Sequence, residues 1–228
     1  MNRKMLFVGL VAALAGTTFT APYNAAAQAT SDGLVAVQSR TLNELYVRPN
    51  ADLATYNKII VDPAQAALKA NWLKDMNATR SVQRWLVPAD AERITDEAAS
   101  SLQAVVTQTF KAQGYEVAAA PGEGVLRLSA SVTDLFVNAP DVPAPGIQRE
   151  FVRDAGDATL RLDVRDAATG TLLARIVDRD TAREIRLINR SNSVSNLFWF
   201  DAMFRQWAAN CAKEFKTART PATAQIRS

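Results

Sequence analysis

Carboxylates are the residues of this sequence whose types and spacing could do chemistry together. Asp178 and Asp180 lie two residues apart, so on a β-strand they would share one face, and Asp134 ends another alternating stretch. Two carboxylates are sufficient for glycoside hydrolysis, in which they serve as acid and as base or nucleophile. The same acids, beside Arg175 and Arg179, are also typical of a solvated strand edge with mixed charges, which is the interpretation we favour.

Other catalytic groups are scarce. The chain has no histidine and one cysteine, Cys211. Without histidine, the usual general base for serine and cysteine nucleophiles and the commonest zinc and copper ligand are missing. A single thiol forms neither a thiolate metal site nor an internal disulfide, and glycine-rich phosphate loops are missing too. We therefore predict no catalytic, cofactor-binding or metal-binding residues, and no enzyme activity.

The first 29 residues are typical of a cleavable signal peptide. Arg3 and Lys4 precede an apolar run over residues 5–16, and Ala27-Gln28-Ala29 is a small-residue cleavage site. The apolar run is shorter than the roughly 20 residues that span a bilayer. No cysteine stands at the cleavage point to be acylated. The sequence predicts a periplasmic or secreted protein, cleaved near Ala29, with neither a lipid anchor nor a stable membrane span.

Length and charge further restrict the class of protein and the kind of partner. Cleavage after Ala29 leaves 199 of the 228 residues, enough for one domain with a sizeable core. Of the 26 basic residues, Arg3 and Lys4 leave with the signal, so 24 basic residues face 23 acidic ones, a net charge of +1. No basic block or stripe is present, which argues against a nucleic-acid partner.

The N-terminal part of the remaining chain is the least regular. Residues 30–50 are polar and weakly periodic, which indicates an extended lead-in that packs partly on the domain. Residues 58–62 form a β-branched run closed by Pro63, and we expect Asp62 to close that strand through a local hydrogen bond. Residues 64–86 stay open between strand, helix and loop, because alanine-rich pieces favour helix while Trp72 and Trp85 favour extended structure.

Two segments have helical spacing. Thr95 can cap a helix whose apolar positions recur up to Phe110, and Gly114 supplies its end. A second helix is predicted from about Ser195 to Thr217. It carries one apolar stripe, which we expect to face the core and which consists of Phe200, Phe204, Trp207, Cys211 and Phe215. Because Cys211 lies on that stripe, we expect a buried and unreactive thiol.

Strands occupy the region between the helices. Residues 126–133 and 160–165 alternate strictly between apolar and polar, which indicates strands with one buried face. A turn at 166–170 leads into residues 172–177, where Arg175 suits neither face and leaves the register open. The proline-rich segment 139–146 is predicted to be a surface loop. This order predicts an α+β fold: a single domain over residues 51–217 with a mostly antiparallel, mixed sheet, two helices on one face, and a disordered tail at 218–228.

Several segments together resemble a known family. They are Tyr46-Val-Arg-Pro-Asn-Ala-Asp-Leu53 with 56–63, Pro121-Gly-Glu-Gly-Val-Leu-Arg-Leu128 with Thr133-Asp134, and Asp166-Ala-Ala-Thr-Gly-Thr-Leu-Leu173 with Asp178-Arg179. In this order they resemble the domain of unknown function 3313 family, uncharacterised bacterial envelope proteins, over roughly residues 42–215. Many members look like lipoproteins, whereas this chain lacks the cysteine. The resemblance implies localisation and fold, and it supplies no catalytic residues.

Three functional hypotheses follow, in descending order. The first is a non-catalytic envelope protein that binds a protein or cell-envelope component, with Trp72 and Trp85 as candidate partner-binding residues, since they lie outside clear periodic elements. For both tryptophans, packing in the core is an alternative of at least equal weight. The second is a periplasmic carrier of a lipid or small molecule, with a cavity between the sheet and the stripe of the last helix. The third is a carboxylate-based hydrolase that uses Asp134, Asp178 and Asp180.

Overall fold

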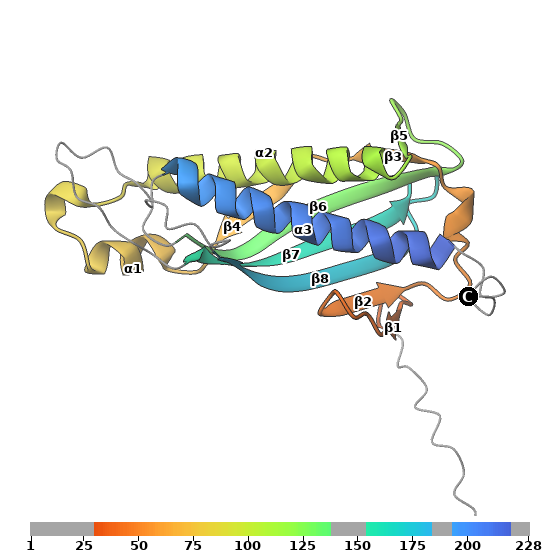
Figure 1. The fold of residues 1–228 in the computed structure, drawn as a ribbon, viewed down its shortest axis with the longest axis horizontal. Helices are drawn as coiled ribbons and strands as arrows, with labels where there is room; N and C mark the ends of the chain where they lie inside the picture. The colour runs from red at the N-terminus through yellow and green to blue at the C-terminus, as the bar shows by residue number, and fades with distance from the viewer. Residues whose placement is uncertain (1–29, 138–153, 184–192, 220–228) are drawn as a thin grey trace, which may run out of the picture.

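The computed structural model describes residues 30–137, 154–183 and 193–219 (Figure 1). It contains one open, mixed sheet of eight strands, and the predicted α+β class is confirmed. The strands cross the sheet in the order β1-β2-β8-β7-β6-β3-β5, while β4 also pairs with β6. Their bounds are β1 Val35–Val37, β2 Glu44–Val47, β3 Lys58–Val61, β4 Gln65–Leu68, β5 Glu116–Val117, β6 Val125–Val137, β7 Asp154–Asp166 and β8 Leu172–Arg183.

The long strands β6, β7 and β8 form the centre of the sheet. They pair antiparallel, with Leu128 opposite Val164 and Leu162 opposite Ile176. The predicted alternation is confirmed in β6, where Leu126, Leu128, Ala130 and Val132 are buried while the residues between them are exposed or half-buried. One face of the sheet is therefore apolar and the other polar, as expected for a sheet covered on one side.

The N-terminal segment contributes two short strands, which form one edge of the sheet. β2 pairs antiparallel with β8, where Leu45 lies opposite Ile176, and β1 pairs with β2. Arg48 strengthens the join, because its Nε donates to the Leu172 carbonyl at 2.6 Å. At the opposite side of the centre, β3 and β4 run parallel to successive parts of β6.

The open segment 64–86 contains one strand and two short helices. After β4, the helix α1 spans Trp72–Ala78, and a 3-10 turn, η2, spans Val82–Arg84. An earlier 3-10 turn, η1, spans Leu53–Thr55. Trp72 and Trp85 therefore both lie in the segment that connects β4 to the next long helix.

The next helix, α2, spans Pro88–Ala112, so the predicted start at Thr95 is wrong. Pro88 occupies the first turn, where its missing N–H leaves no donor unsatisfied. The Asp90 carboxylate accepts the Val87 N–H at 2.9 Å and so closes the end of the helix. The side chains that α2 buries on the sheet include Ile94, Leu102 and Phe110.

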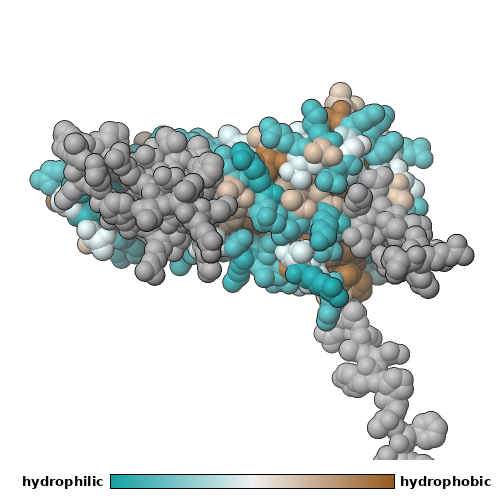
Figure 2. Space-filling model, in the orientation of Figure 1, coloured by the Kyte–Doolittle hydropathy of each residue, from teal (hydrophilic) through white to brown (hydrophobic). Residues whose placement is uncertain are grey.

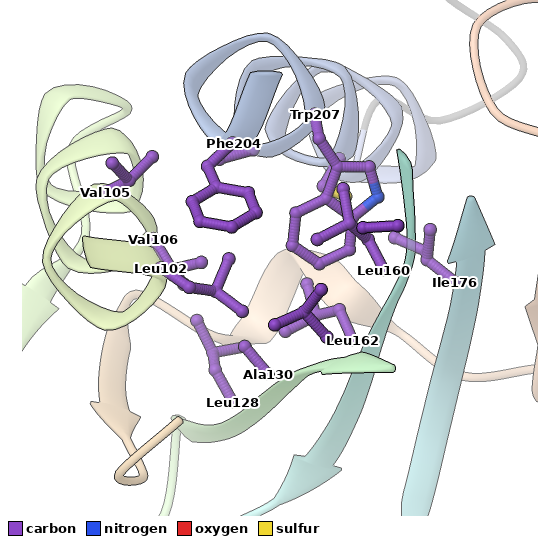
Figure 3. Packing of buried hydrophobic residues seen from close by; sticks show 14 of the residues in the cluster. Leu102, Val105, Val106, Leu128, Ala130, Leu160, Leu162, Ile176, Phe204 and Trp207 are labelled. Atoms are coloured by element: carbon purple, nitrogen blue, oxygen red, sulfur yellow. The ribbon is translucent and has the colours of Figure 1, made fainter. Parts of the chain in front are cut away.

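The helix α3 spans Ser193–Arg219 and lies beside α2 on the same face of the sheet (Figure 1). Every residue of the predicted apolar stripe is buried. Figure 3 shows Phe204 and Trp207 pointing from α3 toward the side chains of β6 and β7. The two helices are also joined by a polar contact, in which the Ser101 hydroxyl donates to the Asp201 carboxylate.

A bulge interrupts the pairing of β6 with β7 between Thr133 and Phe136. Asp134 has a positive φ of 50° there, and Gly156 across the pair has a φ of 139°. A side chain at Gly156 would overlap the Phe136 carbonyl, so glycine is required at that position. The bulge bends the end of the sheet and turns Asp134 outward.

Three predictions lie wholly or partly outside the described residues: the signal peptide at 1–29, the surface loop at 139–146 and the tail at 218–228. Of the tail, residues 218 and 219 are helical, because α3 continues to Arg219.

Candidate partner-binding surface

Five large hydrophobic side chains are exposed within the described residues, and three of them lie within six residues of one another. Val82 is 66% exposed, Trp85 51% and Val87 52%, while Val37 and Val117 lie on short edge strands elsewhere. We call Val82, Trp85 and Val87 the Trp85 surface. A cluster of exposed apolar groups around a tryptophan is typical of protein-binding sites.

The backbone behind the Trp85 surface is fixed by hydrogen bonds. Leu86 is buried, and the Asn77 side chain pairs with both of its backbone groups, accepting from the N–H at 2.8 Å and donating to the carbonyl at 2.9 Å. The Trp85 indole N–H donates to the Arg80 carbonyl at 3.3 Å. With Leu86 held inward, its neighbours Trp85 and Val87 must face outward, so the surface is organised before any partner arrives.

Trp72, the other predicted binding residue, is not part of this surface. It is 2% exposed, and its indole N–H donates to the Val137 carbonyl at 3.1 Å. As a core residue it ties α1 to the end of β6. Of its two predicted alternatives, exposed anchor or packed core residue, Trp72 therefore has the core role, whereas Trp85 is 51% exposed.

The segment that carries the surface is basic. Residues 72–87 contain three basic residues, Lys74, Arg80 and Arg84, and one acidic residue, Asp75, which gives a net charge of +2. Figure 1 shows this segment, in yellow, beyond the start of α2 at one end of the molecule. By contrast, the surface over α2 and α3 is mostly hydrophilic, with small separate apolar patches (Figure 2). The basic, apolar segment therefore differs from the helical face of the protein.

The carboxylates proposed for hydrolysis do not form one group. Asp178 faces the helices and is buried, so its assignment to a solvated strand edge is wrong. Its carboxylate accepts the Asn43 N–H at 3.1 Å, and burial raises its pKa above the ordinary value. β2 and β7 flank β8 on either side at residues 174–177, and Asp178 directly follows this flanked part.

Asp134 and Asp180 do approach each other. They line an open hollow of about 270 Å³ at the bulged end of the sheet, together with Asp157 and Arg179. The described residues contain no group of three or more acids or cysteines placed to hold a metal ion. The hollow therefore has carboxylates in proximity, but Asp178 is not among them.

Asp62 also differs from expectation. Its carboxylate accepts the Arg127 Nε–H at 2.8 Å and the Ser129 hydroxyl at 2.7 Å, so it joins β3 to β6 and does not close its strand through a local hydrogen bond. The partners come from residues 65 and 67 positions later, which a local turn pattern cannot reveal.

The interface of α3 with the sheet is closely packed. Cys211 is buried, as predicted, and burial raises its thiol pKa well above the ordinary value. An opening between β2, β8 and α3, lined by Leu45, Ala174 and Phe215, has a volume of about 20 Å³. That space is about the size of one water molecule, which counts against a lipid carrier at this interface.

No helix of the described residues combines the length and the apolar character needed to cross a membrane.

The sequence pattern did not predict Val82 and Val87 as surface residues, because they follow no helical or strand period. The signal that could have found them is their position around a tryptophan just before Pro88, where no regular element can bury them.

The model of the family described as "Protein of unknown function (DUF3313)" matches residues 22–211. The curated proteins give no match.

Among solved structures, the protein XCC0632 from Xanthomonas campestris, family-model DUF330, is 10% identical, with a TM-score of 0.41 and coverage of 76% of this chain and 89% of that chain. The PelC dodecamer from Paraburkholderia phytofirmans is 13% identical, with a TM-score of 0.36 and coverage of 72% and 96%. A putative neuraminyllactose-binding hemagglutinin homolog from Helicobacter pylori is 12% identical, with a TM-score of 0.38 and coverage of 75% and 89%. These likenesses are too distant to transfer functional residues to this chain.

Proposed function

The chain belongs to the DUF3313 family of proteins of unknown function, and we propose that this member is an exported, non-catalytic envelope protein that binds a partner protein. The Trp85 surface carries the proposal, because a rigidly held, half-exposed tryptophan flanked by two exposed valines has no role in the core. The signal-like residues 1–29 support export.

The surface indicates what kind of partner it fits. Its exposed side chains, Val82, Trp85 and Val87, are apolar, so a complementary surface must be apolar too. We therefore propose a partner protein with an apolar pocket that accepts the Trp85 side chain.

The test is site-specific photo-crosslinking in cells that produce the full chain, with the crosslinking residue at position 83 or, as a control, at position 117. We expect one discrete adduct from position 83 alone. The partner, once identified, is purified, and its affinity is measured for Trp85→Ala and for Val117→Ala, which removes a similarly exposed side chain at a distant strand.

A tryptophan at the centre of an interface contributes at least about 2 kcal/mol, so Trp85→Ala should weaken binding at least about 30-fold while Val117→Ala leaves it unchanged. Equal binding by the two variants would overturn the assignment of this surface. Retention of the intact N-terminus in the cytoplasmic fraction would overturn export.

A further inference from the structure

A second charged site lies on the face of the sheet opposite α2 and α3. Arg161, Asp163 and Arg165 alternate to this face along β7, and Arg175 lies directly opposite Asp163 on β8. We call Arg161, Asp163, Arg165 and Arg175 the arginine cluster. None of these residues was singled out as functional in the sequence, and the family match assigns them no role.

One carboxylate gathers the three guanidinium groups. Asp163 accepts two hydrogen bonds from Arg161, at 3.1 and 3.0 Å, and two from Arg175, at 2.8 and 3.2 Å. Arg165 approaches the same carboxylate to 3.6 Å. Arg161 and Arg165 are four residues apart on a strand, a Cα separation of about 13 Å, so they meet only because both turn toward Asp163.

The Asp163 carboxylate remains ionised. Burial acts to raise its pKa, but the hydrogen bonds from Arg175 and Arg161 outweigh burial, and the pKa lies below the ordinary value. Its side chain is only 11% exposed, whereas those of Arg161 and Arg165 are 45% and 38% exposed. Asp163 therefore acts as a buried support that directs two accessible guanidinium groups toward one spot.

Positive charge exceeds negative charge at this spot. Besides Asp163, the one acid within salt-bridge distance of the cluster in the described residues is Asp32, which accepts from Arg175 at 2.6 Å. Arg48 lies beside them, and its Nε and Nη2 donate to the backbone carbonyls of Leu172 and Asp32. Four arginines thus face two carboxylates, a surplus of two positive charges.

The strand register places two arginines opposite each other, and a bound anion would reduce the repulsion between them. Arg127 on β6 lies directly opposite Arg165 on β7, and like charges in that position destabilise a sheet. Arg127 is paired with Asp62 at 2.8 Å, whereas the contacts of Arg165 within the described residues are the longer one to Asp163 and a weak bond of 3.3 Å to the Gly170 carbonyl. An anion bound beside Arg165 would offset this repulsion.

We propose that the arginine cluster is a binding site for a phosphate group. The planar guanidinium fork matches the oxygens of phosphate, and a phosphate monoester carries nearly two negative charges near neutral pH, which equals the local surplus. The group could belong to a soluble phosphate or to a phospholipid headgroup, since both present anionic phosphoryl oxygens; the phosphodiester of phosphatidylglycerol carries one negative charge and two non-bridging oxygens.

The test uses the chain from residue 30 to 228, titrated with inorganic phosphate at constant ionic strength and followed through the arginine Nε–Hε signals by NMR. We expect saturable shifts that chloride does not produce. Arg161→Gln with Arg165→Gln should weaken binding at least about tenfold. The control Arg205→Gln, an exposed arginine on α3, should bind as the unaltered chain does.

Two further measurements keep the result interpretable. Arg165→Gln alone removes the residue with the weakest contacts, so it should keep the fold, checked by its melting temperature, and still reduce affinity. Vesicles of phosphatidylglycerol, compared with phosphatidylcholine, identify the source: cosedimentation that is lost in the double variant supports a lipid headgroup, and saturable phosphate binding without it supports a soluble phosphate. The absence of both, or equal binding by the double variant and Arg205→Gln, would overturn the proposal.

Discussion

Among the described residues, each face of the sheet buries one carboxylate, and the pKa values of the two carboxylates shift in opposite directions. Asp163, on the face opposite the helices, is surrounded by arginines, and its pKa is lowered. Asp178, on the helical face of the neighbouring strand, accepts from a backbone N–H and has no arginine or lysine side chain bonded to it within the described part of the chain, and its pKa is raised chiefly by burial. Burial alone therefore does not decide the charge state of an acid; its partners do.

The comparison extends to what holds each face together. The helical face is stabilised by apolar packing among the helices and β6, β7 and β8 (Figure 3). The opposite face has partly exposed polar side chains joined by ion pairs, which contribute little when solvent reaches them. The following predictions test this difference, from the largest expected effect to the smallest.

Phe204→Ala should lower the free energy of unfolding by about 3–5 kcal/mol, because it leaves a cavity at a position with no exposure. Ser131→Ala, a change on the opposite face of β6, should alter it by less than about 0.5 kcal/mol. Urea unfolding of the two variants measures both. Similar losses would show that the two faces do not differ as described.

Asp163→Asn should lower the free energy of unfolding by about 1–2 kcal/mol at pH 7, a value reduced because Arg161 and Arg165 are partly solvated. Since the folded pKa is depressed, this stability is present above the ordinary value of 3.8 and is lost as the pH falls through the folded pKa. Urea unfolding between pH 2 and about 7 should show the variant and the unaltered chain converging in acid. A constant difference over that range would contradict the ionised state of Asp163.

Asp178→Asn should have the opposite sign to Asp163→Asn and a smaller effect, a gain in the free energy of unfolding of up to about 1 kcal/mol at pH 7. The raised folded pKa means that Asp178 contributes stability below 3.8 and loses it as the pH rises through the folded pKa. Asparagine stays neutral and still accepts the Asn43 N–H. The same urea series should show the gain disappearing in acid, whereas a loss at pH 7 would indicate that the carboxylate is needed in its ionised form.

The local sequence pattern was sufficient to predict much of this fold. Period-two alternation correctly assigned the buried face of β6, and the four-three-four-four spacing correctly assigned the buried stripe of α3. The same alternation, continued from Ala174 through Ile176, places Asp178 on the helical face. The charge of Arg175 made the buried face of β8 hard to assign, because the sequence does not show that Asp163 lies opposite Arg175 on β7.

The candidate sites depend on contacts between residues that are far apart in the sequence. Trp72 and Trp85 look alike in the sequence, and the difference between them is that Val137, 65 residues away, accepts the indole N–H of Trp72. The arginine cluster likewise requires the register of β7 with β8 and the return of residue 32 to the sheet edge. Neither pairing has a local signature, so composition could suggest Trp85 but could not separate it from Trp72.

The pairing of β2 with β8 also determines when this protein can finish folding. Leu45 and its strand partner Ile176 are 131 residues apart, so one of the first strands made must wait for one of the last. Contacts of this separation slow folding, because a long loop must close before they form. Until β8 is available, the edge of β2 that pairs with it and the apolar side chain of Leu45 stay uncovered, and such exposed edges and apolar groups favour aggregation during that interval.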